Sequence, residues 1–245
     1  MVLSGICRHG DRIRLPVPAR PGRLSGTIDM RTRIKICGMT RAQDVDAAVR
    51  AGADAVGFVF YPPSARSISA EHAASLAARL PPFVTAVGLF VNADAATVRT
   101  TAMRAKLQLL QFHGDETASF CASFDLPFIK AARVRPGLDL VELSENFKAA
   151  RGILLDAFVE GYGGGGEVFD WSLIPKEIAA RAVLSGGLHA ANVAAGICAL
   201  RNLGAPDPAP LGVDVSSGVE TAKGIKDNAL IAQFVAAVRA ADDGT

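Results

Sequence analysis

The sequence predicts a single (β/α)8 barrel, the TIM-barrel fold, in which parallel strands close into a cylinder surrounded by helices. Short apolar segments alternate with helical patterns about eight times, at roughly 25 residues per unit, as closure of such a barrel requires. With 245 residues, 50% of them hydrophobic, the chain can bury one large core or two small ones, and a barrel of this size would be a single domain. An open doubly wound sheet shows the same alternation, but no GxGxxG follows the first strand, and equal units favour the closed form.

The first unit, residues 33–40, is predicted to contain a strand that ends at a cysteine. Strand side chains alternate between faces, so the two isoleucines point to one face and Lys35 and Cys37 to the other. Gly38 frees the backbone for a sharp turn. We expect Thr40 to cap the helix that follows.

The later strands are predicted from apolar runs, and the helices from the amphipathic patterns between them. The second run is almost continuously apolar, which is typical of a parallel strand covered on both faces. The later strands are expected at 54–60, 83–91, 107–113, 127–132, 152–156, 182–185 and 211–215. The later helices are expected up to residue 80, from about 94, from about 116, at 138–148, after 171, at 190–203 and at about 226–240.

Charge and cysteine usage restrict the function classes. The chain has 26 basic and 24 acidic residues, which gives no electrostatic indication of nucleic acid or an anionic membrane as partner. The sequence contains no run of 18 or more apolar residues, so it predicts no membrane-spanning helix. The 4 cysteines show no CxxC pair and no spacing typical of a metal site or disulfide framework. We therefore expect reduced thiols, a cytoplasmic protein and no metal.

Residues 1–32 differ from the rest and are predicted to form a basic, disordered or irregular extension, which leaves 33–245 as the barrel domain. The extension is rich in arginine, and Pro16, Pro18 and Pro21 interrupt any helix. It lacks the apolar segment of a secretion signal, and its prolines are incompatible with an amphipathic transit helix. The alternative is a start codon assigned too early, because Met30 lies just before the first strand.

Chemically reactive side chains gather at the carboxyl ends of the predicted strands, where barrel enzymes place their active sites. By alternation, those expected to face the interior are Lys35, Cys37, Gln111, His113, Asp156 and Asp214. Lys130 on the fifth strand is expected to do the same. Burying polar groups costs free energy unless they bond to one another or to a ligand, so the cluster predicts a site.

Two glycine-containing turns, 185–188 and 214–220, follow the seventh and eighth strands. Loops at these positions hold phosphate in many barrels, because glycine lets backbone N–H groups approach the phosphate oxygens. One GG turn is usually only flexible, but two at adjacent positions are a stronger indication. The expected phosphate-binding residues are Gly186, Gly187, Asp214, Ser216, Ser217 and Gly218.

Several motifs occur in a fixed order along the strand ends. They are KICGMT, GFVFYPPSARSIS, LLQFHG, LLDAF with a later YGGGGEVFDW, SGGL and DVSSGVE. Together, over residues 33–240, they resemble the phosphoribosylanthranilate isomerase family. The resemblance implies conversion of N-(5-phosphoribosyl)anthranilate to 1-(2-carboxyphenylamino)-1-deoxyribulose 5-phosphate, an Amadori rearrangement of L-tryptophan biosynthesis that needs no cofactor.

The resemblance also implies roles for individual residues. It places the general base at Cys37, whose thiolate Lys35 would favour, and the general acid at Asp156, which must hold a proton near neutral pH. Arg66 is suited to the anthranilate carboxylate, because its planar guanidinium can bind a carboxylate in a bidentate manner. His113 is expected to orient the substrate, and a histidine bonded to backbone is the alternative there.

Other functions stay open at this point. A second phosphosugar barrel, either a ribulose-phosphate epimerase or an indole-glycerol-phosphate synthase, would share the phosphate turns. The epimerase would need metal-binding histidines at several strand ends, and the cysteine of KICG argues against the synthase. A non-catalytic phosphosugar-binding regulator would be expected to lack Cys37 or Asp156. The expected partner is a small phosphosugar substrate, and the chain can be a monomer or a homodimer.

Overall fold

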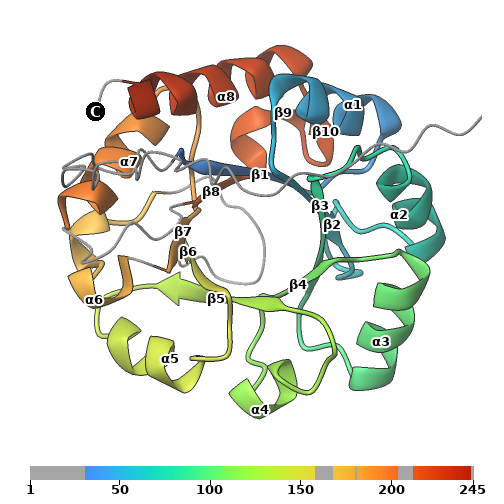
Figure 1. Ribbon diagram of the computed structural model, residues 1–245, viewed down its shortest axis with the longest axis horizontal. Helices are drawn as coiled ribbons and strands as arrows, with labels where there is room; N and C mark the ends of the chain where they lie inside the picture. The colour runs from blue at the N-terminus through green and yellow to red at the C-terminus, as the bar shows by residue number, and fades with distance from the viewer. Residues whose placement is uncertain (1–30, 158–167, 180, 204–211, 244–245) are drawn as a thin grey trace, which may run out of the picture.

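The computed structural model describes residues 31–157, 168–179, 181–203 and 212–243, and there it confirms the predicted barrel. The strands close in sequence order, with β1 beside β8, and helices form a ring around them (Figure 1). The barrel strands are β1 (Arg33–Cys37), β2 (Ala55–Val59), β3 (Thr85–Phe90), β4 (Leu109–Phe112), β5 (Phe128–Val134), β6 (Gly152–Ala157), β7 (Ala182–Leu184) and β8 (Gly212–Val215).

The helices follow the strands as predicted. They are α1 (Ala42–Ala51), α2 (Ala70–Ala77), α3 (Ala95–Arg104), α4 (Ala118–Cys121), α5 (Leu140–Asn146), α6 (Lys176–Ala179), α7 (Val193–Asn202) and α8 (Asn228–Asp243). Short 3-10 helices, η1 (Trp171–Leu173) and η2 (Ser217–Val219), and a hairpin of β9 (Glu220–Ala222) and β10 (Ile225–Lys226) complete the described elements. Within these residues, no helix combines the length and apolarity needed to cross a membrane. Residues 1–30 and the glycine run 163–166 lie outside the described residues, so the division at residue 33 stays a prediction.

Side-chain caps start several helices. The capping oxygens belong to Ser69, Asp94, Thr117 and Asp139, each of which accepts from the backbone N–H three residues later. The cap predicted at Thr40 is wrong. Helix α1 begins after Arg41 without a side-chain cap, and the Thr40 hydroxyl donates to the Gly224 carbonyl at 2.6 Å. Thr40 therefore ties the turn after β1 to the β9–β10 hairpin.

Apolar side chains fill two layers. The larger layer lies between strands and helices and contains Phe58, Phe90 and Phe112, all fully buried. The smaller cluster contains Ile129, Ala131 and Leu154, from alternate positions of β5 and β6. Leu109 and Val183 pack against this second cluster, which lies on the inner face of the barrel strands.

Lys130 does not face the barrel interior, which corrects the prediction. It alternates with the interior residues of β5, and its Nζ donates to Glu116 at 2.9 Å and lies 5.6 Å from the centre of the Phe147 ring. The same ammonium donates to the Gly114 carbonyl. Lys130 therefore holds the loop after β4 in place from the outer layer.

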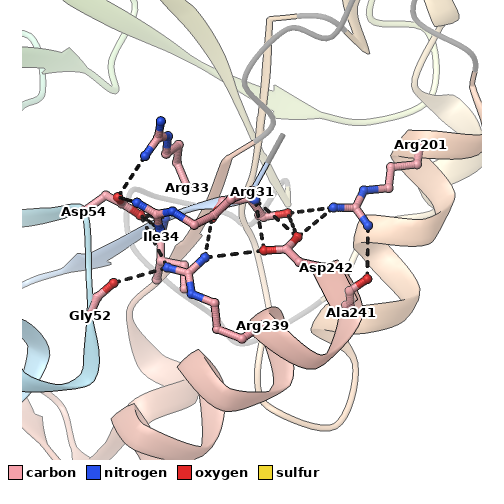
Figure 2. A network of polar contacts seen from close by, with 10 residues as sticks. Arg31, Arg33, Ile34, Gly52, Asp54, Arg201, Arg239, Ala241 and Asp242 are labelled. Atoms are coloured by element: carbon pink, nitrogen blue, oxygen red, sulfur yellow. Dashed lines mark hydrogen bonds and ion pairs between the residues drawn. The ribbon is translucent and has the colours of Figure 1, made fainter. Parts of the chain in front are cut away.

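Two carboxylates join β1 to neighbouring elements at the amino-terminal end of the barrel (Figure 2). Asp242 of α8 accepts from the Thr32 N–H at 3.0 Å, the Thr32 hydroxyl at 2.6 Å and Arg201 at 2.7 Å. Asp54, just before β2, accepts from the backbone of β1 at 2.9 Å and pairs with Arg31. These bonds secure the start of β1 at the opposite end from the predicted site.

Candidate functional site

A cavity opens at the carboxyl ends of the strands, with about 700 Å³ of empty space when the part open to solvent is included. The predicted site residues that line it are Cys37, Arg66, His113, Asp156, Gly186, Gly187, Asp214, Ser216 and Ser217. Gly218 is not part of the lining. It packs behind the turn, where a Cβ would come within 1.9 Å of the Leu188 carbonyl oxygen.

Cys37 ends β1, and its thiol is buried against the glycine of β2. A Cβ built on Gly57 would lie 2.7 Å from Cys37 Sγ and 3.2 Å from Lys35 Nζ, so both groups use the space that this glycine leaves. Lys35 Nζ pairs with Asp214 at 2.8 Å, and the two residues are opposite each other in the β1–β8 register. A thiol, an ammonium and a carboxylate therefore form one buried group on the inner face of the barrel.

Burial controls the charges in this group. It raises the pKa of the Cys37 thiol, and the Lys35 ammonium acts in the opposite direction without cancelling the effect. Burial also acts to lower the pKa of Lys35, but the negative charge of Asp214, its hydrogen-bond partner, is the main effect that opposes burial, and that pKa is left raised. Lys35 is therefore a cation at neutral pH and Cys37 is mainly a thiol, and the Lys35 ammonium is the nearest group that favours the thiolate form.

Asp156, near the end of β6, is bonded to His113 from the end of β4. His113 Nε2 lies 3.0 Å from Asp156 Oδ2, and His113 Nδ1 lies 3.0 Å from Nε2 of Gln111. Gln111 is fully buried, and its Oε1 has no hydrogen-bond partner in the part of the chain that the structure describes. The histidine that we predicted to orient the substrate thus contacts the predicted acid.

Arg66, in the loop after β2, is bonded to Glu220 at the end of the 214–220 turn. Its Nε and Nη2 donate to the two carboxylate oxygens, both at 2.8 Å. Glu220 also accepts from Lys226 Nζ at 2.8 Å. Sequence reasoning assigned no role to either partner. Glu220 could have been noticed as the acid that closes DVSSGVE, whereas nothing near Lys226 in the sequence marks it.

The two glycine turns lie on adjacent sides of the cavity. Gly186 and Gly187 have φ angles of +78° and +60°, and a Cβ on Gly186 would come within 2.4 Å of the Ala157 nitrogen. Glycine is therefore required at residue 186 both for backbone conformation and for space. Among the described residues, no three His, Cys, Asp or Glu side chains are grouped to hold a metal ion.

Comparison with known proteins connects this cavity to a family. The model of the family described as N-(5'phosphoribosyl)anthranilate (PRA) isomerase matches residues 34–237. The chain belongs to the phosphoribosylanthranilate isomerase family. Isomerases so named from Dechloromonas aromatica and Methylibium petroleiphilum are 59% and 56% identical over 214 and 213 residues. Each match covers 87% of this chain, and 99% and 96% of those two proteins.

Solved structures of phosphoribosylanthranilate isomerases share the fold. The enzyme from Thermotoga maritima is 41% identical with a TM-score of 0.76, over 85% of this chain and 99% of that one. A phosphoribosylanthranilate isomerase in complex with reduced 1-(o-carboxyphenylamino)-1-deoxyribulose 5-phosphate is 39% identical, with a TM-score of 0.73 and the same coverage. The chain is therefore an isomerase of tryptophan biosynthesis, and the epimerase, synthase and regulator alternatives are set aside.

Proposed function

We propose that the chain converts N-(5-phosphoribosyl)anthranilate to 1-(2-carboxyphenylamino)-1-deoxyribulose 5-phosphate by an Amadori rearrangement that needs no cofactor. The observation that carries this proposal is a thiol and a carboxyl group, Cys37 and Asp156, on different strands around one cavity. The rearrangement needs a base and an acid. The 39% identical relative bound to the reduced product supports the choice of substrate.

In the first step, Asp156 opens the ribose ring. It donates its proton to the ring oxygen as the C1–O bond breaks, while the lone pair of the anilino nitrogen forms a C1=N double bond. The product is an open-chain iminium ion. His113, bonded to the carboxyl group at 3.0 Å, keeps Asp156 in place during this transfer.

In the second step, the Cys37 thiolate removes the proton from C2. The C–H electrons form a C1=C2 double bond and the iminium nitrogen becomes neutral, which gives an enolamine. The enolamine takes up a proton at C1 while the C2 hydroxyl becomes the ketone. Lys35 supplies positive charge beside the thiolate, and this charge opposes the rise in the pKa of Cys37 that burial causes.

Groups that match the two charged ends of the substrate line the cavity. Nη1 of Arg66 has no hydrogen-bond partner among the described residues, and it would bind the anthranilate carboxylate. The turns 185–188 and 214–220 would hold the phosphate through backbone N–H groups and serine hydroxyls. Asp214 has the same sign of charge as a phosphate, so we assign it to holding Lys35 beside the phosphate region.

The proposed partner is this small phosphosugar alone. One similar structure is described as monomers generated from the dimeric phosphoribosylanthranilate isomerase of Thermotoga maritima, at 37% identity. For the present chain, monomer and homodimer both stay predictions.

The fluorescence of freshly made phosphoribosylanthranilate tests the function, because the signal is lost as the substrate is consumed. Wild-type protein should remove it without added cofactor. Cys37→Ala and Asp156→Asn should each lower kcat by about 10²-fold or more, the usual contribution of general acid–base catalysis. Cys198→Ala, which removes an exposed thiol of α7, should leave kcat unchanged. Wild-type turnover by Cys37→Ala or by Asp156→Asn would refute the catalytic role of the residue replaced. Absence of turnover by the wild-type protein would refute the proposed function.

A further inference from the structure

One edge of the Arg66 guanidinium is already occupied by the protein. Nε and Nη2 donate to the two oxygens of Glu220 at 2.8 Å each, and the two side chains are only 9% and 4% exposed. The aliphatic part of Arg66 crosses Gly38, where a Cβ would come within 2.5 Å of Arg66 Cδ. Because the guanidinium is planar, fixing this edge fixes the direction of the free edge, which consists of Nη1 and the second N–H of Nη2.

Glu220 is itself held by a buried lysine. Lys226 Nζ donates to Glu220 Oε1 at 2.8 Å, to the Ser216 carbonyl at 3.0 Å and to the Ser216 hydroxyl at 3.2 Å. An ammonium has three donors, so all of them are used. The Ser216 hydroxyl donates to the Cys37 carbonyl at 3.1 Å. Arg66 is thereby connected through Glu220 and Lys226 to the turn after β8 and the end of β1.

The charges in this group do not balance. Two basic side chains, Arg66 and Lys226, share the single carboxylate of Glu220. Burial lowers the pKa of Lys226, with Glu220 opposing that effect, whereas the pKa of Arg66 is raised by its hydrogen bonds to Glu220. Burial acts to raise the pKa of Glu220, but Arg66 and Lys226 outweigh it and leave that pKa lowered, so Glu220 is an anion at neutral pH. A ligand carboxylate at the free edge of Arg66 would pair the remaining charge, whereas an uncharged ring would leave it buried and unpaired.

We propose that Glu220 is the positioning residue that makes this cavity specific for a ligand with a carboxylate. Glu220 does not contact the ligand in this assignment. It aligns Arg66 so that the free edge of the guanidinium binds the ligand carboxylate in a bidentate manner. Lys226 holds the Glu220 side chain in place through its hydrogen bond. The inference rests on the proposed function for the identity of the ligand, but not on the chemistry of the isomerisation.

Binding of two unreactive ligands tests the proposal. The first is 1-(2-carboxyphenylamino)-1-deoxyribitol 5-phosphate, and the second is its phenylamino counterpart without the carboxylate. In calorimetry, wild-type protein should bind the first ligand about 10- to 100-fold more tightly, as expected for hydrogen bonds between charged groups. Glu220→Gln should reduce this preference by about 10-fold and leave the affinity for the second ligand within about 3-fold. Glu220→Asp, which keeps the charge but shortens the side chain, should give an intermediate preference.

A matched control and a second variant complete the design. Asp46→Asn breaks an exposed arginine–carboxylate pair between α1 and Arg79, and it should leave both affinities unchanged. If Glu220→Gln fails to fold, Arg66→Lys takes its place, since it keeps the charge but removes the planar fork, and it should lose the same preference. Equal weakening of both ligands, or an unchanged preference, would overturn the proposal. Preferential binding without turnover of the substrate would instead contradict the proposed function and leave this inference standing.

Discussion

Gly57 provides the space in which the proposed general base sits, so Gly57→Ala should move the base directly. The new Cβ would lie 2.7 Å from Cys37 Sγ, 3.1 Å from Cys37 Cα and 3.2 Å from Lys35 Nζ. The Cα belongs to the backbone of a closed sheet, which cannot shift without disturbing both neighbouring strands. The thiol and the ammonium therefore have to give way.

The size of the effect follows from these distances. Ordinary contacts between non-bonded heavy atoms are about 3.5–4.0 Å, so the thiol has to retreat by about 1 Å. A misplacement of this size can cost about 10²-fold in rate, and we expect kcat to fall by about 10- to 100-fold. Overpacking of a core typically costs about 1–3 kcal/mol of unfolding free energy, so the variant should still fold.

Steady-state fluorescence measurements with phosphoribosylanthranilate, together with urea unfolding, check this prediction. Gly212→Ala is the matched control, because it adds the same methyl group to β8, where the nearest atom, Cγ2 of Val183, is 3.4 Å away. That variant should keep wild-type kcat. A Gly57→Ala protein with wild-type kcat would refute our account of how the thiol is placed.

Three further predictions concern the charged groups. Lys35→Met should move the acid limb of the pH dependence of kcat/KM to higher pH, and Asp214→Asn should move it to lower pH, because the ammonium lowers and the carboxylate raises the pKa of Cys37. His113→Ala should lower kcat about 10- to 100-fold with little change in KM, and His113→Gln should retain more activity; a raised KM alone would instead indicate substrate contact. Asp242→Ala should lower the unfolding free energy by about 2–4 kcal/mol in urea without lowering kcat, because it removes the acceptor of several bonds at the far end of the barrel.

The barrel could be predicted because its strands are buried on both faces. Such strands appear as short, nearly continuous apolar runs, and every observed barrel strand overlaps the range expected for it. Polar side chains are rare in these runs, so the few at the strand ends indicate a functional site. That contrast predicts a site that contains Cys37, His113, Asp156 and Asp214, and all of them line the cavity.

The same burial explains the errors. On a strand covered on both sides, alternation separates two faces but does not say which face is inward, so the predicted inward direction of Lys130 is wrong. In the structure it finds a carboxylate and an aromatic ring in the outer layer. Thr40 has the sequence pattern of a helix cap, but the Gly224 carbonyl, far away in the sequence, competes for its hydroxyl.

The pairing of the charges could not be predicted because it depends on how the sheet closes. Lys35 and Asp214 are 179 residues apart, and the β1–β8 register sets them opposite each other. A shift of one residue would turn Asp214 to the other face and leave Lys35 without its anion. With Lys35 satisfied there, Glu220 is left to pair with Arg66 and Lys226, so the remaining positive charge lies where the proposed substrate would bring its carboxylate. A motif indicates which charged residues are present at a strand end, whereas the register of the closed sheet determines which of them remains for the ligand.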